Sequence, residues 1–174
     1  MITKRNLIAV ALVCTFMLVG NARAARLLSF VDQQQGWMVG FGPNVYHTGD
    51  GGKNWEKQPT PAKAKLNAVY FVDSEHGWAV GDRGTVLQTS DGGKRWRRRP
   101  VGRHRRPVKA NLLDVSFYDA SHGWAVGDLS TFLKTTDGGV TWQVSQIDPL
   151  SGPLTGVSFA SSLDPEFNGG PNFG

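Results

Sequence analysis

The sequence predicts an all-β fold, a β-propeller made of four-stranded blades, because one motif occurs three times with the same internal spacing. The motif joins a Gly-Trp pair to an Asp-Gly-Gly turn 13 residues further on, and its copies centre on Asp50, Asp91 and Asp137. The copies lie 41 and then 46 residues apart. A period of this length is typical of propeller blades of four short strands.

The first strand of each unit is predicted from apolar residues at alternating positions, which mark a strand with one inward face. The residues concerned are Leu66, Val69 and Phe71 in the second unit, Leu112, Val115 and Phe117 in the third, and Leu28 and Phe30 in a more degraded first copy. The Gly-Trp runs at 36–40, 77–81 and 123–127 come next. Their β-forming residues between glycines predict the most buried strand of each blade.

A tight turn follows each second strand, most clearly at 81–84, where glycine supplies the positive φ that such turns need. Third strands are predicted at 45–48, 86–89 and 132–135. The Asp-Gly-Gly turn then leads to a fourth strand that begins near the next tryptophan. The resulting blades cover about 27–59, 66–100 and 112–146.

A fourth unit begins but is not completed. Leu154, Val157 and Phe159 repeat the first-strand pattern, so 154–160 is expected to be a partial blade, but Asp164-Pro165-Glu166 stands where Gly-Trp is due. We therefore expect an incomplete ring within 25–160 and a disordered or truncated tail at 161–174. Closed propellers have about four to eight blades. Truncation of a longer propeller is the favoured explanation, and self-association of copies to close the ring is the alternative.

Residues 1–24 have the pattern of a cleaved signal peptide. Lys4 and Arg5 precede an apolar run at 7–19, and Ala22-Arg23-Ala24 offers the small residues of a cleavage site after Ala24. The run is shorter than the roughly 20 residues that span a bilayer, so an uncleaved anchor is the alternative interpretation. The only cysteine, Cys14, lies inside this run, so the mature chain is expected to have no disulfide. We expect an exported protein of the periplasm or the extracellular space.

The Asp-Gly-Gly hairpins are predicted to be structural. The aspartate can accept backbone N–H groups across its own turn, the second glycine takes a conformation that side chains resist, and the indole packs on the hairpin base. The residues so assigned are Asp50, Gly52, Trp55, Asp91, Gly93, Trp96, Asp137, Gly139 and Trp142. Catalysis would require carboxylates within reach of one substrate, whereas these belong to successive blades. No catalytic residue, metal site or cofactor is predicted.

The strongest candidate for binding is a basic band, defined as the nine basic residues between Lys94 and Lys109, a stretch without any acidic residue. Removal of residues 1–24 lowers the formal net charge from +5 to +2, so the remainder of the mature chain carries −7. The predicted binding residues are Arg95, Arg97, Arg98, Arg99, Arg103, Arg105, Arg106 and Lys109. A solvated loop that protects a sheet edge is the plainer explanation. We favour anion binding, because so many like charges repel one another unless a negatively charged partner compensates them.

The three copies resemble Asp-box (BNR) repeats of sialidases and other propellers. The longer pattern from Gly77 to Trp96 is similar to the photosystem II stability/assembly factor family, and this resemblance covers Leu27 to about Phe159. It implies an exported seven-bladed propeller without catalytic activity that acts as an assembly chaperone in the thylakoid lumen or the periplasm. For photosynthetic members the resemblance also implies an arginine patch that is implicated in holding a reaction-centre subunit. This chain has about half of the expected blades.

These observations lead to one favoured function and one alternative. The favoured function is a non-catalytic scaffold whose basic band docks an acidic segment of a membrane or exported protein, with anionic lipid headgroups or acidic polysaccharide as further anionic partners. Nucleic acid is not expected for an exported protein. The alternative is a sialidase-like propeller that binds or cleaves carbohydrate. The tyrosines of the mature chain, Tyr46, Tyr70 and Tyr118, lie in strand patterns, and the arginines crowd into one segment, which disfavours a sialidase site.

Overall fold

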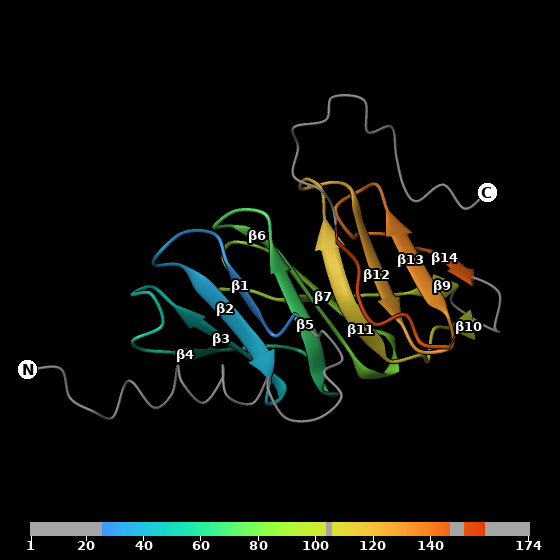
Figure 1. Cartoon of the computed structure of the whole chain (residues 1–174), viewed down its shortest axis with the longest axis horizontal. Coiled ribbons are helices and arrows are strands. Elements are labelled where there is room, and N and C mark those ends of the chain that lie inside the picture. Colours follow the sequence, from blue (N-terminus) through green and yellow to red (C-terminus); the bar gives the residue numbers. More distant parts are fainter. Residues whose placement is uncertain (1–25, 104–105, 147–151, 159–174) are drawn as a thin grey trace, which may run out of the picture.

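The computed structural model describes residues 26–103, 106–146 and 152–158, and three four-stranded antiparallel sheets account for most of them (Figure 1). Within each sheet the strands pair in chain order, so each blade is an up-and-down meander. Blade one consists of β1 (Leu28–Phe30), β2 (Gly36–Gly40), β3 (Gly42–Thr48) and β4 (Glu56–Gln58). This arrangement confirms the predicted propeller fold of three four-stranded blades in an open ring.

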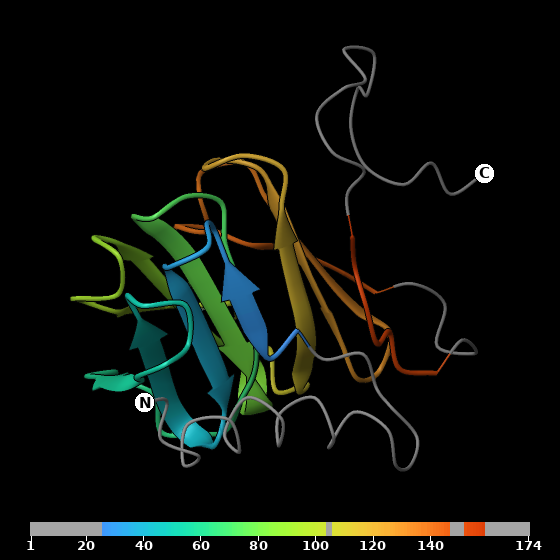
Figure 2. The ribbon, with the colours of Figure 1, turned by 60° about the vertical axis from the view of Figure 1, so that its left-hand side comes forward.

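Blades two and three repeat the same plan with longer first strands. Blade two consists of β5 (Leu66–Phe71), β6 (His76–Gly81), β7 (Thr85–Ser90) and β8 (Arg97–Arg99), with a 3₁₀ turn at Asp82–Gly84. Blade three consists of β11 (Leu112–Phe117), β12 (Gly123–Gly127), β13 (Thr131–Thr135) and β14 (Gln143–Gln146). Between them, β9 (Gly102–Arg103) and β10 (Arg106–Pro107) form a small antiparallel hairpin. Figure 2 shows the three blades one behind another.

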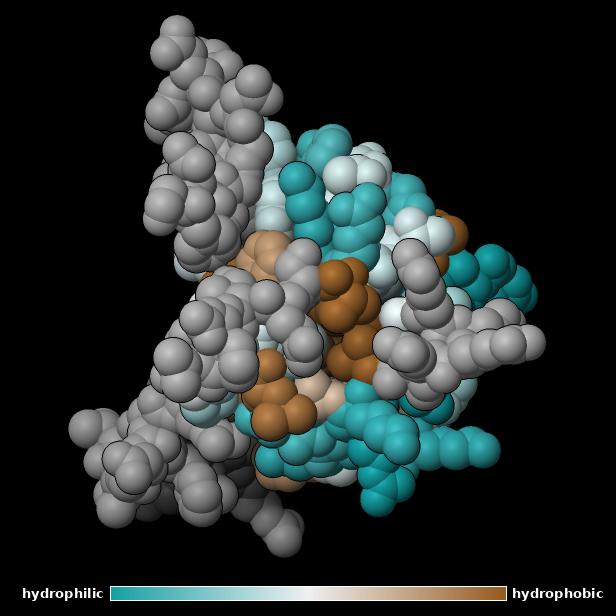
Figure 3. All heavy atoms as spheres, turned by 90° about the vertical axis from the view of Figure 1, so that its right-hand side faces the viewer, coloured by the Kyte–Doolittle hydropathy of each residue, from teal (hydrophilic) through white to brown (hydrophobic). Residues whose placement is uncertain are grey.

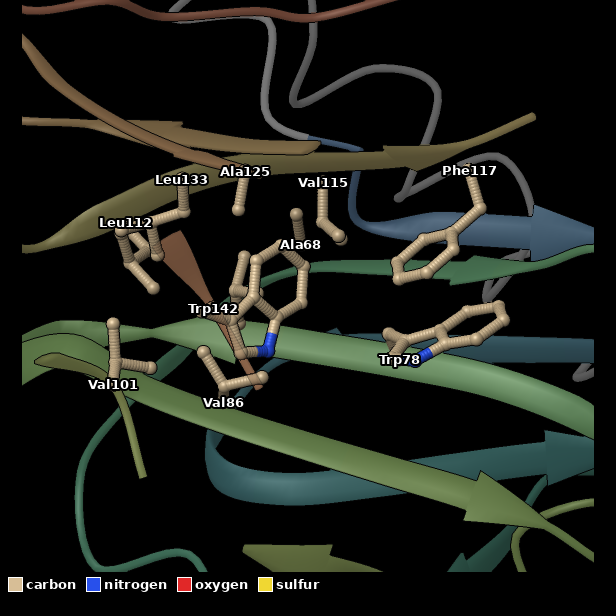
Figure 4. Close-up of a cluster of buried hydrophobic side chains, with 11 residues drawn as sticks. Ala68, Trp78, Val86, Val101, Leu112, Val115, Phe117, Ala125, Leu133 and Trp142 are labelled. Carbon is tan, nitrogen blue, oxygen red and sulfur yellow. The ribbon is translucent and has the colours of Figure 1, made fainter. Parts of the chain in front are cut away.

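The blades pack face to face through aromatic side chains that belong to the repeat. The Trp37 ring stacks on Phe71 with centroids 3.6 Å apart, and the Trp78 ring stacks on Phe117 at 3.4 Å. Each of these phenylalanines also makes a T-shaped contact with a tryptophan of its own blade, Phe71 with Trp96 and Phe117 with Trp142. The phenylalanine ring therefore lies between two indoles. Figure 4 shows Trp78 and Phe117 in the core between blades two and three. The residues that join neighbouring blades are therefore themselves part of the repeated motif.

Of the expected fourth blade, the structure describes only residues 152–158. Residues 152–158 carry no assigned strand, although the Leu154 N–H donates to Gly127 O at 3.1 Å and the Val157 N–H donates to Asp114 Oδ2 at 2.9 Å. A first strand is held by ladder bonds to the second strand of its own blade. The residues that would form this second strand, together with Phe159, lie outside the described part of the chain. The strand at 154–160 thus stays a prediction.

Both predicted terminal segments fall outside the described residues: the signal peptide at 1–24 and the tail at 161–174. Over the residues that the structure describes, no helix has the length and apolar character needed to cross a membrane.

Candidate functional site

The three Asp-Gly-Gly hairpins have one geometry, which is local. In blade two, the Thr89 hydroxyl donates to Asp91 Oδ1 at 2.9 Å and accepts the Gly93 N–H at 2.9 Å. The Arg95 N–H donates to the same carboxylate oxygen at 2.9 Å. Blades one and three repeat these three bonds at distances between 2.8 and 2.9 Å. Each carboxylate is therefore engaged within its own turn.

The hairpin hydrogen bonds favour the charged form of each aspartate. The Asn54 N–H, followed by the Asn54 side-chain amide and the Thr48 hydroxyl, lowers the pKa of Asp50 to about 2. Burial acts to raise the pKa of Asp91, but the Arg95 N–H and the Thr89 hydroxyl outweigh it, so this pKa is lowered as well. A catalytic acid would need a raised pKa to hold its proton near neutrality.

The glycines and tryptophans of the hairpins serve the same local architecture. Gly52, Gly93 and Gly139 have φ of 86°, 84° and 83°, a region that disfavours side chains. Trp96 and Trp142 are buried, whereas Trp55 is half-buried. The hairpins lie on successive blades, and no group of three or more His, Cys, Asp or Glu side chains suited to a metal occurs within the described ranges. The arrangement provides turns and packing surfaces rather than a shared cavity.

The basic band follows the outer edge of blade two. Arg97 and Arg98 are exposed on β8, the outermost strand of that sheet, while Arg99 is half-buried and its Nε donates to Gln88 Oε1 at 2.7 Å. Arg98 pairs with Leu87, and its two neighbours pair with Gln88 and Val86. Since strand residues alternate between faces, Arg97 and Arg99 share the face toward blade three and Arg98 lies on the opposite one.

The remaining band residues occupy both ends of this edge. Lys94 and Arg95 are exposed in the Asp-Gly-Gly turn that precedes β8. Arg103 and Arg106 are register partners in the β9–β10 hairpin, and Arg105 lies outside the described residues. Lys109 is exposed at the other end, where the Gly84 N–H donates to Ala110 O at 2.8 Å. The band is therefore an elongated strip rather than one compact cluster.

A second polar region, which sequence reasoning missed, lies on the inner strands. Asp114 is 4% exposed, and burial raises its pKa against the opposing effects of the Val157 N–H and Arg26. Arg26 Nη1 donates to Ser116 Oγ at 3.3 Å, and the guanidinium lies over the Tyr70 ring, 4.9 Å from its centroid. A cavity of about 370 Å³ adjoins Arg26, Tyr70 and Ser116. The sequence signal that could have revealed this region is Asp114 itself, which stands at the position where the second unit has Ala68.

Fold and site together define an Asp-box β-propeller with an elongated basic edge. The chain belongs to the family of the photosynthesis system II assembly factor YCF48, whose model matches residues 57–107 and 102–163. A structure of YCF48 bound to a D1 peptide is 26% identical with a TM-score of 0.60, and the match covers 71% of this chain and 41% of that one. YCF48 from Cyanidioschyzon merolae is 22% identical with a TM-score of 0.60, covering 76% and 44%.

An ancestral GH74 enzyme shares the fold at 15% identity and a TM-score of 0.56, covering 74% of this chain and 19% of the enzyme. At that identity the likeness concerns the fold alone. No curated protein sequence matches the chain. The match spans less than half the length of either YCF48 structure.

Proposed function

We propose that this chain is an exported, non-catalytic propeller scaffold that binds an acidic segment of a membrane or exported protein and assists its assembly into a complex. Family membership supports the assembly role. The YCF48 structure with a D1 peptide supports a peptide segment as the kind of ligand. In this proposal the protein acts in the periplasm, or in the thylakoid lumen if its host is photosynthetic.

The observation that carries the proposal is the placement of exposed arginines on an open sheet edge. Arg97 and Arg98 lie on β8, where one side of the strand has no ladder partner within the described sheet. The ion pairs found among the described residues are His–Asp pairs elsewhere, at Asp73 and Asp119. Guanidinium groups without acidic partners are suited to carboxylates, which they bind through paired hydrogen bonds.

The strand geometry also suggests the form of the bound segment. Two residues on one face of a strand lie about 7 Å apart, as do alternate residues of an extended peptide. An extended segment with acidic residues at alternating positions would therefore match Arg97 and Arg99. Backbone pairing with the free edge of β8 would add affinity in the manner of strand addition. Lys94 and Lys109, at the two ends of the strip, would extend the favourable field.

The direct test compares two variants with the same loss of charge. The band variant replaces Arg97, Arg98, Arg103 and Arg106 with glutamine, and it keeps Arg99 because that side chain holds Gln88. The control variant replaces the four exposed lysines Lys53, Lys57, Lys63 and Lys65 with glutamine. Binding of a labelled peptide with alternating glutamates is measured by fluorescence anisotropy at several salt concentrations.

We expect the band variant to bind at least about tenfold more weakly and to lose its salt dependence, and the control to bind like the parent. Equal binding by both variants would remove the docking proposal. Anionic vesicles and an acidic polysaccharide are tested in parallel, because their anions share the chemistry of a carboxylate-rich peptide. Hydrolysis of a fluorogenic sialoside would instead support the carbohydrate-active alternative.

A further inference from the structure

The loops of the propeller lie on two rims, because the strands of each blade alternate in direction. The hairpin rim carries the Asp-Gly-Gly turns and the turns between first and second strands. The tip rim carries the turns between second and third strands and the connections between blades, and β2 and β12 point toward it, downward in Figure 1. Blades pack against one another through their sheet faces, so a neighbouring blade leaves both rims open.

The tip rim carries the two most exposed large apolar side chains in the described part of the chain. Leu129 is 74% exposed and Phe41 is 59% exposed, and each lies in the turn that follows the second strand of its blade. The corresponding turn of blade two presents Arg83, which is exposed. Single exposed apolar residues are ordinary on protein surfaces, but these two occupy corresponding turns of one rim. The three turns thus present two apolar tips and one cationic tip.

The backbone holds the Leu129 side chain in solvent at a cost in strain. Leu129 and Ser130 have φ of 56° and 53°, in the left-handed region that side chains disfavour. Ser130 is buried and its hydroxyl donates to Gly152 O at 3.1 Å, which anchors the turn. The leucine gains no burial in return for this strain. Strained positions of this kind cluster at functional sites.

Phe41 is also held in a defined position. The Asn44 side-chain amide donates to Phe41 O at 3.0 Å, and the Phe41 ring makes a T-shaped contact with Tyr46 at 6.3 Å between centroids. This contact covers only part of the ring, as its exposure shows. Both apolar tips are therefore fixed in place while their side chains face water.

The two rims differ in charge. Among the described residues outside strands, the tip rim has four exposed bases and two acids, whereas the hairpin rim has three bases and seven acids. Those of the tip rim are Lys63, Lys65, Arg83 and Lys109, with Asp82 and Asp128. Those of the hairpin rim are Lys53, Lys94 and Arg95, with Asp32, Asp50, Asp73, Glu75, Asp91, Asp119 and Asp137. The molecule therefore has one basic rim and one acidic rim.

The bases of the tip rim are available to an outside partner. Its two acids are half-buried and accept hydrogen bonds from asparagine amides, Asp82 from Asn67 at 2.8 Å and Asp128 from Asn111 at 3.0 Å. The ion pairs found among the described residues involve none of its four bases. Figure 3, which views the molecule from the blade-three end, shows hydrophilic and apolar residues next to one another toward the lower side.

We propose that the tip rim rests on a membrane surface that contains anionic headgroups. Phe41 and Leu129 enter the boundary between headgroups and acyl chains, while the four bases contact headgroup phosphates. Peripheral binding grows with the apolar area buried and with the attraction of basic residues to anionic lipids, and the tip rim supplies both. The acidic hairpin rim faces away from the membrane, so the charge difference between the rims also fixes the orientation.

The spacing of the tips favours a lipid surface over a protein partner. Phe41 belongs to blade one and Leu129 to blade three, and blade two with Arg83 lies between them. A fluid surface receives separated side chains without a matching shape, whereas a protein interface needs a contiguous complementary patch. Near Leu129 a hollow of about 470 Å³ is also lined by Lys109, so a cation and an apolar tip border the same depression.

The experiment places an environment-sensitive nitrobenzoxadiazole label on a cysteine introduced at one position of the full chain, with Cys14→Ser in every sample. Phe41→Cys and Leu129→Cys carry the label on the tips. The matched control is Ser74→Cys, an exposed position on the hairpin rim. Each protein is titrated with vesicles of phosphatidylcholine alone and of phosphatidylcholine with phosphatidylglycerol. Near-ultraviolet circular dichroism establishes that each protein is folded.

We expect both tip labels to brighten and shift to the blue with the phosphatidylglycerol vesicles, and to respond less to the neutral ones. The label at Ser74→Cys should keep the spectrum that it has in water. Unchanged tip labels would overturn the proposal. Equal responses at all three positions would also overturn it, because adsorption without orientation, or insertion of the apolar run at 7–19, does not distinguish the rims.

A second measurement tests whether the two tips act together. In the protein labelled at Leu129→Cys, Phe41→Ser removes the other tip, and Val140→Ser is the matched control because Val140 is 44% exposed on the hairpin rim. We expect Phe41→Ser to need at least about tenfold more lipid for the same shift, and the control to need no more. Equal lipid requirements would overturn the two-tip contact. The peptide-binding test of the basic band contains no lipid, so either proposal can fail alone.

Discussion

Blade one and blade two come from the same repeat, but they differ in how their aromatic residues are covered. Phe71 in blade two lies between Trp37 of blade one and Trp96 of its own blade, and it is 4% exposed. Phe30 in blade one touches Trp55 on one side and is 41% exposed. The difference teaches that the core of a blade is shared with its neighbour. A blade is completed by the next sheet rather than by its own hydrogen bonds.

The largest effect is expected from Phe71→Ala. This substitution removes the middle ring of an aromatic sandwich and leaves a cavity between two blades, which costs about 3–5 kcal/mol of the free energy of unfolding. Urea unfolding followed by tryptophan fluorescence measures this loss. A cost below that of Phe30→Ala would contradict the shared-core interpretation.

A smaller effect is expected from Phe30→Ala, the matched substitution in blade one. The ring is partly solvated already, so its removal from the monomer costs about 1 kcal/mol. Urea unfolding followed by tryptophan fluorescence measures this cost. A cost equal to that of Phe71→Ala would show that the Phe30 ring is covered as fully as the Phe71 ring.

The smallest effect concerns pH and the hairpin of blade one. The pKa of Asp50 is lowered in the folded chain from 3.8 to about 2, so the unfolded chain binds the proton more readily. The stabilisation is complete above the unfolded pKa and is lost as pH falls through the folded pKa. We expect Asp50→Asn to flatten the fall in stability between these two values, as measured by urea unfolding at a series of acidic pH values. An unchanged pH profile would show that Asp50 has the same pKa in the folded and the unfolded chain.

The basic band illustrates a different limit of sequence reasoning. Its composition and its connection between blades two and three were visible in the sequence, and the Ala110–Gly84 bond places one end beside the predicted turn. The sequence did not reveal which face of blade two carries Arg98 and which carries Arg97 and Arg99, because this depends on the register of β8 against β7. Nor did it reveal that Arg99 is held by Gln88, a contact across two strands.

Asp114 and Arg26 show the same limit in a buried setting. The aspartate interrupts an apolar strand pattern, and spacing alone does not name its partners. Val157 and Arg26 lie 43 and 88 residues away in the chain, and only the packed structure brings them to it. Burial of a carboxylate is tolerated when backbone N–H groups and a nearby positive charge compensate for lost water.

The sequence by itself determined the number of blades, their strand order and the hairpin turns. The hairpin turns rest on bonds between residues no more than four positions apart, such as Thr89 with Gly93, and the number and strand order of the blades follow from a motif whose copies repeat each other. Only the tertiary structure decided which copies of a repeated residue are covered. Phe30, Phe71 and Phe117 have equivalent sequence positions, but burial is a property of the neighbouring sheet, and local sequence does not contain the neighbour.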